Sequence, residues 1–115
     1  MKPNSEEAEC LTFVDWLNLK GLKFTHIGNE SGYKDKKLAW IMQGKKNRMG
    51  MSKGVPDYMI ITPRGLVFVE MKRKGPSSTS PEQKAWIEAL NQIKGVQAQV
   101  CKGFDSAVEF VTQFL

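Results

Sequence analysis

The sequence of 115 residues lacks the features that define several large classes of protein. It has only two cysteines, Cys10 and Cys101, and their wide separation excludes a disulfide framework and the short spacing of a zinc site. No apolar run approaches the ~18 residues that a membrane-spanning helix needs. The N-terminal segment becomes acidic at once, which is not typical of a secretory signal. We therefore expect an intracellular protein with no membrane partner and with both cysteines reduced in its core.

Histidine is also scarce, and neither it nor the three tryptophans form a recognisable catalytic pattern. His26 is the only histidine, so no serine or cysteine triad is indicated, and it is interpreted as an ordinary strand residue. Trp16, Trp40 and Trp86 fall at apolar positions of expected helices. Those positions favour core packing over base stacking.

What the chain does have is the composition of one globular domain, residues 1–115, with an excess of positive charge. Hydrophobic residues make up 41% and charged residues 25%, and the formal net charge is +5. Two basic segments carry much of that charge: Lys34, Lys36, Lys37, Lys45, Lys46, Arg48 and Lys53 in the first, and Lys72, Arg73 and Lys74 in the second. A solvated basic face would explain either segment alone. Two of them flanking one candidate site favour contact with nucleic-acid phosphates, above all through Lys45, Lys46, Arg48, Lys53, Arg73 and Lys74.

Local patterns in the N-terminal half predict two helices and a strand. Asn4 and Glu7 have the spacing of a capping box that opens a helix ending near Leu19. Its expected apolar side consists of Cys10, Leu11, Val14 and Leu17. Residues 23–27 predict a short strand, and Asp35 is expected to cap a short helix to Met42, although residues 38–42 could equally be extended. Residues 44–54, with three glycines and four cations, predict a loop.

The C-terminal half predicts a hairpin, a helix, a strand and a last helix. Residues 57–62 and 66–72 are β-branched or aromatic runs that flank a turn at residues 63–65. Ser80 followed by Pro81 and Gln83 is a strong helix start, and that helix is expected to reach about Lys94. Its expected inner side consists of Ala85, Trp86, Leu90 and Ile93. Residues 96–101 predict a strand, and Asp105 is expected to cap the last helix. The order α-β-(α)-β-β-α-β-α predicts an α/β fold with a mixed sheet flanked by helices.

The hairpin brings two carboxylates to one end. Symmetric pairing about Arg64 would set Asp57 opposite Met71, and a register shift of one would set it opposite Glu70. Directly opposed side chains have Cβ atoms about 5 Å apart. Two carboxylates at that distance repel each other unless a cation lies between them, and an oxygen-rich site of this kind suits Mg²⁺ or Mn²⁺.

A lysine accompanies this carboxylate pair. Glu70 and Lys72 are two residues apart, so they project from one face of the strand, whereas Val67, Val69 and Met71 project into the core. An ammonium beside the carboxylates can position a water and stabilise charge on a phosphate. An exposed Glu–Lys pair on a solvated sheet would explain those two residues alone. A catalytic site is favoured by three further features together: the position of Asp57, the two basic segments and a carboxylate earlier in the chain.

These residues resemble a known family. Gly-Val-Pro-Asp at 54–57, Val-Glu-Met-Lys at 69–72 and Ser-Pro-Glu-Gln at 80–83 resemble the core of the PD-(D/E)XK nucleases, with their restriction-endonuclease-like fold. The closest resemblance is to the virus-type replication-repair nuclease (VRR-Nuc) branch, in its stand-alone phage and bacterial form. Asn29 and Glu30 and the closing strand and helix also fit this pattern.

The resemblance implies a role for each matching residue. Asp57 and Glu70 would bind Mg²⁺ or Mn²⁺, with the backbone carbonyl of Met71 as a further ligand. Lys72 would be the catalytic lysine, and Gln83 would face the site from the following helix, a role that competes with helix capping. A glutamate on the first helix, Glu6 or Glu7, would complete the acidic set. Glu7 is preferred because it extends the stripe of Cys10 and Val14, although capping with Asn4 competes for it.

The function that the resemblance implies is a metal-dependent DNA endonuclease. It would leave 5′-phosphate products and act as a homodimer in DNA repair on branched DNA such as Holliday junctions. Two alternatives stay open: a catalytically silent nucleic-acid-binding module on the same fold, and an enzyme that acts on RNA or a small substrate.

Overall fold

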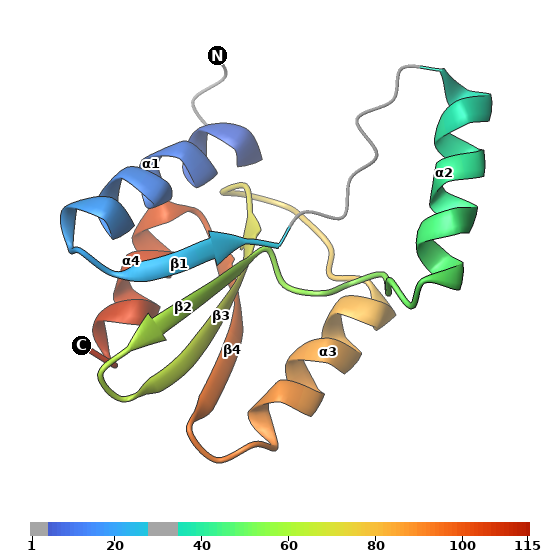
Figure 1. The fold of residues 1–115 in the computed structure, drawn as a ribbon. Coiled ribbons are helices and arrows are strands. Elements are labelled where there is room, and N and C mark those ends of the chain that lie inside the picture. The colour runs from blue at the N-terminus through green and yellow to red at the C-terminus, as the bar shows by residue number, and fades with distance from the viewer. Residues whose placement is uncertain (1–4, 28–34) are drawn as a thin grey trace.

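A mixed four-stranded sheet lies at the centre of the computed structural model, which describes residues 5–27 and 35–115 (Figure 1). The strand order β1-β2-β3-β4 follows the chain, with antiparallel pairing from β1 to β3 and parallel pairing of β3 with β4. The strands are β1 Lys23–His26, β2 Tyr58–Thr62, β3 Gly65–Lys72 and β4 Val96–Lys102. The helices are α1 Glu6–Leu19, α2 Lys36–Arg48, α3 Pro81–Asn91 and α4 Phe104–Thr112. The predicted mixed α/β fold is confirmed.

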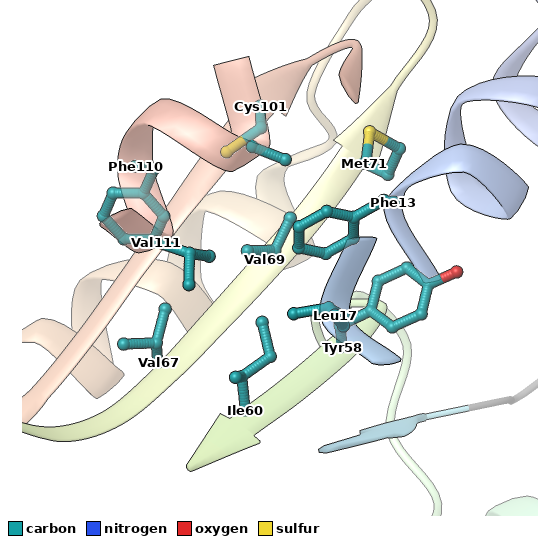
Figure 2. Close-up of a cluster of buried hydrophobic side chains, with 11 residues drawn as sticks. Phe13, Leu17, Tyr58, Ile60, Val67, Val69, Met71, Cys101, Phe110 and Val111 are labelled. Atoms are coloured by element: carbon teal, nitrogen blue, oxygen red, sulfur yellow. The ribbon is translucent and has the colours of Figure 1, made fainter. Parts of the chain in front are cut away.

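The core lies between the sheet and the helices α1 and α4 (Figure 2). Phe13 and Leu17 of α1 meet Phe110 and Val111 of α4 over the face of β3. That face of β3 consists of Val67, Val69 and Met71, as the two-residue period of a strand predicts. The same period directs Glu70 and Lys72 to the opposite face, where the first turn of α3 lies.

The start of α1 differs from the prediction. Ser5 is the N-cap, and its side chain accepts a hydrogen bond from the Ala8 N–H at 3.1 Å. The predicted cap Asn4 lies outside the described residues. The buried side of α1 follows Glu9, Phe13 and Leu17 at four-residue spacing, so Cys10 and Val14 are only half-buried and Leu11 is 50% exposed.

The predicted loop at residues 44–54 is wrong in its first part, because α2 continues to Arg48. Asp35 caps this helix as expected, accepting hydrogen bonds from the N–H groups of Lys37 and Leu38. Gly44 sits inside the helix, where a glycine costs only about 1 kcal/mol and does not outweigh the good helix formers around it. Trp40 was expected in the core, but it is 78% exposed, whereas Trp16 and Trp86 are half-buried.

Helix α3 begins as predicted and ends three residues early. The capping box of Ser80 and Gln83 is present, with Pro81 in the first turn. Asn91 ends the helix, and its side-chain amide pairs with both backbone groups of Ala98, thereby covering the outer edge of β4. Ala85 and Ile93 are consequently exposed instead of facing the sheet.

Helix α4 is capped by another helix, not by Asp105. Its N-cap residue Gly103 has no side chain to contribute, and Asp105 already lies inside the first turn. The buried carboxylate of Glu9 accepts a hydrogen bond from the Phe104 N–H at 2.6 Å instead. This contact ties the start of α4 to α1.

Both cysteines are free thiols, Cys101 in the core and Cys10 half-buried. None of the helices in residues 5–27 and 35–115 has the length and apolar character needed to cross a membrane.

Candidate active site

The register of the hairpin sets Asp57 against Glu70. Thr62 pairs with Gly65 beside the turn and Tyr58 pairs with Val69 at the other end. Continuing that register by one residue places Asp57 opposite Glu70, which is the shifted alternative of the two registers considered from the sequence. The two-residue turn Pro63-Arg64 produces the shift.

The carboxyl groups of Asp57 and Glu70 lie in contact with each other. Asp57 is held by the backbone N–H of Met71, which donates to its Oδ2 at 2.7 Å, and its carboxyl shares a hydrogen bond with Glu70. Burial raises the pKa of Asp57 above its usual range. Burial, and after it the charge of Asp57, raises the pKa of Glu70 to about 8. The pair therefore retains a proton near neutral pH, and a bound cation would relieve the repulsion that keeps it there.

Lys72 and Gln83 complete a hydrogen-bonded group with Glu70. The Lys72 ammonium donates to Gln83 Oε1 at 3.0 Å, and Gln83 Nε2 donates to Glu70 Oε2 at 3.2 Å. Lys72 Nζ also lies 3.7 Å from that carboxylate oxygen. Gln83 Oε1 accepts from the Ser80 N–H at 3.0 Å as well. From the sequence, Gln83 was expected either to cap the helix or to contact the site. In the structure its side chain does both.

A hollow of about 410 Å³, here called the acidic pocket, opens between α1 and the end of the hairpin. It is lined by Glu6, Glu7, Cys10, Leu11, His26, Asp57 and Tyr58. Both candidate glutamates of α1 thus face it. The charge of Glu6 raises the pKa of Glu70, which gives Glu6 a direct electrostatic link to the carboxyl pair. The choice of Glu7 from its helical position stays a prediction, and this link makes Glu6 the stronger candidate.

His26 also lines the acidic pocket, a position that was not predicted from the sequence. It ends β1 opposite Tyr58, and the two ring centroids are 5.0 Å apart. Its charge lowers the pKa of Asp57. The pairing of β1 with β2 brings it to the site, and a lone histidine in a short strand carried no sign of that pairing.

The oxygen donors of the site fit a hard cation that keeps part of its water shell. Within residues 5–27 and 35–115, no group of three or more histidine, cysteine, aspartate or glutamate side chains is arranged to hold a metal ion. Two carboxylates, Asp57 and Glu70, are in contact, and the proposed carbonyl ligand Met71 follows Glu70 directly. Mg²⁺ is commonly bound by one or two carboxylates with several waters retained, so this donor set suits it.

The predicted nucleic-acid contacts lie on exposed segments. Lys53, Arg73 and Lys74 are exposed in loops on either side of the site, and Lys74 forms an exposed ion pair with Asp105 at 3.4 Å. Lys45, Lys46 and Arg48 lie in the last turn of α2. Asn29, Glu30 and Lys34 lie outside the described residues.

The chain matches one protein family over most of its length. The model of the VRR-NUC domain family matches residues 2–105. The chain belongs to the VRR-NUC family. The solved structure of a "VRR_NUC domain protein" shares 26% identity and superposes with a TM-score of 0.79, covering 100% of this chain and 91% of that one. A second solved structure, titled "VRR_NUC domain", shares 19% identity at a TM-score of 0.63, with 96% and 99% of the two chains covered, and supports the fold alone. No curated protein sequence matches this chain.

The family assignment confirms the resemblance drawn from residues 54–83 and identifies a nuclease-type domain. The roles of Asp57, Glu70, Lys72 and Gln83 in this VRR-NUC domain stay predictions, supported by the contacts described above.

Proposed function

We propose that this VRR-NUC domain is a Mg²⁺- or Mn²⁺-dependent endonuclease that hydrolyses phosphodiester bonds of DNA. One observation carries the proposal: a buried, proton-sharing carboxyl pair lies beside a lysine that a glutamine holds in place. A protein that only binds nucleic acid has no need for carboxylates at the phosphate.

Each residue has a distinct part in this chemistry. Asp57, Glu70 and the Met71 carbonyl would hold the metal ion, and Glu6 or Glu7 would add to the negative charge around it. The ion, when bound, supplies Lewis-acid stabilisation of the phosphate and a lowered pKa for a water molecule. Lys72 directs its ammonium at the attacking water or at a phosphate oxygen. Gln83 holds Lys72 through its amide oxygen and Glu70 through its amide nitrogen, so it fixes the geometry of both.

We further propose a homodimer that acts on branched DNA such as Holliday junctions and leaves 5′-phosphate ends. One compact site cuts one strand, and a two-fold axis would supply a second cut of opposite polarity. The basic residues Lys45, Lys46, Arg48, Lys53, Arg73 and Lys74 would contact the phosphates.

The test is a cleavage assay with Mg²⁺ or Mn²⁺ on four-way junctions, flaps, linear duplex, single strands and RNA. Lys72→Ala and Glu70→Ala should abolish cleavage. Lys102→Ala is the matched control, because Lys102 is the exposed residue that pairs with Lys72 on β4. Cleavage that survives both site substitutions would refute the proposal, and binding without cleavage would support the silent module instead.

The dimer has its own test. Paired, symmetric nicks in a four-way junction together with a dimeric mass in sedimentation equilibrium are expected. A monomer that makes single nicks would refute the homodimer and leave the endonuclease chemistry intact.

A further inference from the structure

Helix α2 stands apart from the rest of the described structure. It extends away from the sheet (Figure 1), and none of the other helices or strands packs against it. None of its residues is buried. Isolated helices of this length are marginal in water, because most helical stability in proteins comes from tertiary packing. The helix therefore gains from a partner outside the described fold.

The charge of α2 indicates what kind of partner it fits. The helix carries five cations, Lys36, Lys37, Lys45, Lys46 and Arg48, and it contains no acidic residue. Two copies of such a helix would repel each other if they met face to face. A polyanion complements it.

A hollow of about 370 Å³, here called the α2 notch, lies along α2. It is lined by Trp40, Ile41, Gln43, Gly44, Asn47 and Arg48. Trp40, Gly44 and Arg48 are four residues apart, so they form one row on the helix surface. Gly44 lies between an indole and a guanidinium, and a Cβ placed on it would meet nothing within 4 Å. The glycine thus leaves a gap between two flat groups.

We infer that the α2 notch binds an unpaired base of the nucleic-acid substrate. The exposed indole of Trp40 offers a stacking surface, and the planar Arg48 cation can stack on a base or contact its phosphate. Gln43 and Asn47, whose amides are joined by a 2.9 Å hydrogen bond, also line the gap, and its lining is mainly apolar, which suits the face of a base. Bases inside a continuous duplex are already stacked, so the notch favours substrates with unpaired bases, such as flaps, tails and open branch points. The inference rests on the proposed function only in taking the substrate to be nucleic acid.

The loop that follows α2 passes next to the catalytic residues. Gly54, in the loop that follows α2, lies against the first turn of α3: a Cβ on it would come within 2.6 Å of the Glu82 backbone and 2.7 Å of that of Gln83. Gln83 is the residue that holds Lys72 and Glu70. A base bound in the α2 notch is therefore held on a helix whose connecting loop meets the catalytic group.

The test compares a blunt DNA hairpin with the same hairpin carrying a single-stranded thymidine tail, both binding to metal-free protein in EDTA. Fluorescence anisotropy should show that the tail increases affinity roughly ten-fold, within the range measured for base–aromatic stacking. Tryptophan fluorescence should be quenched only by the tailed DNA. Trp40→Ala and Gly44→Leu should remove the gain from the tail while blunt-hairpin affinity stays unchanged. Gly44→Leu fills the notch, keeps every cation and favours the helix, so its loss of tail binding would not reflect unfolding.

Met49→Ala is the matched control, because Met49 is an exposed apolar residue at the end of the same helix outside the notch. It should keep the gain from the tail. An unchanged gain in Trp40→Ala and Gly44→Leu would overturn the inference. A dimer that Trp40→Ala converts to a monomer, with tail binding unchanged, would overturn it too and identify α2 as a contact between copies. Binding is measured without metal, so the two proposals can fail separately. A wild-type protein that cleaves no DNA but still prefers the tailed hairpin would refute the endonuclease proposal and leave the inference about the α2 notch intact.

Discussion

Glu70 is the residue whose proposed role costs the fold most, because the proposed metal site needs a carboxylate that is buried beside another. It is 4% exposed, lies against Asp57, and has a pKa raised to about 8 from an ordinary value of 4.5. Between these two values the folded protein keeps a proton that the unfolded chain has released. The free energy of unfolding of the metal-free protein therefore falls as the pH rises from about 4.5 to 8.

Glu70→Gln should remove this pH dependence, because glutamine cannot release a proton. We expect the variant to be more stable than the wild type at pH 8 by on the order of 1–3 kcal/mol, and of similar stability near pH 5. Urea unfolding at a series of pH values in EDTA measures this. Adding Mg²⁺ at pH 8 should stabilise the wild type and not the variant. A variant that loses stability with pH as steeply as the wild type would contradict this account of Glu70.

Gln83 has two tasks, and a pair of substitutions separates them. Ser80→Ala removes the side-chain cap of α3, which should cost about 1 kcal/mol of stability, with little loss of cleavage. Gln83→Ala should cost a similar amount of stability but also release Lys72 and Glu70, lowering kcat at least ten-fold. Thermal melts and steady-state cleavage of one four-way junction give both quantities. Equal cleavage by the two variants would reduce Gln83 to a capping residue.

The site residues that could be predicted from the sequence are those whose positions follow from local geometry. Asp57, Glu70 and Lys72 could be found because a tight turn fixes the register to within one residue and the strand period fixes the face. His26 could not, because its approach to Asp57 depends on how β1 docks on the sheet. The choice between Glu6 and Glu7 stayed open, because it depends on how α1 docks on the sheet. Gln83 was found, and the contacts show why its two roles could not be separated: one amide group serves both.

Helix α4 depends on a residue far away in the sequence for the cap at its start. Its first N–H groups have no side-chain cap of their own, and Glu9 accepts the hydrogen bond of Phe104 from across the core. Glu9→Ala should cost about 1–3 kcal/mol, because it leaves a buried N–H without its partner. Asp105→Ala removes only an exposed ion pair and a charge near the helix end, and it should cost less than about 1 kcal/mol. Equal losses in urea titrations of the two variants would show that the Glu9 cap is unimportant.

The loop between α2 and β2 depends on a glycine. Gly54 has a φ of +87°, and a Cβ there would collide with the backbone of Glu82 and Gln83. Gly54→Ala should therefore cost at least ~2 kcal/mol and reduce cleavage, since it displaces the turn that carries Gln83. Gly75→Ala is the control, with a φ of +93° but no atom nearer than Arg73 at 3.8 Å. It should show only the smaller cost of the backbone conformation.

Element ends were harder to predict than the elements themselves. The start of α3 was predicted correctly because the side chains of Ser80 and Gln83 accept hydrogen bonds from its first N–H groups and Pro81 has no N–H to satisfy. The start of α4 was not, because its cap comes from α1. The extent of α2 was also missed: glycine and clustered lysines indicated a loop, yet a solvent-exposed helix tolerates both at small cost.

Across the whole molecule, burial is distributed very unevenly. Residues of α1, α4 and the strands β2, β3 and β4 form the core, whereas α2 contributes nothing to it. Local stability should follow burial, because a segment without buried contacts can open without disturbing the rest. The proposed substrate-binding helix α2 is then the least stable part of the described fold, and the proposed catalytic site is anchored on one of the most stable strands.

Hydrogen exchange can measure this distribution and connect it to binding. In the free protein, amides of β3 and α1 should exchange only on global unfolding, and amides of α2 should exchange orders of magnitude faster. Adding tailed DNA hairpin in EDTA should slow exchange across α2 while leaving α4, on the far side of the core, unchanged. Gly44→Leu should lose the slowing that the tail produces. Strong protection of α2 in the free protein at low concentration would show that this helix is already packed, and protection that rises with protein concentration alone would show that a second copy covers it.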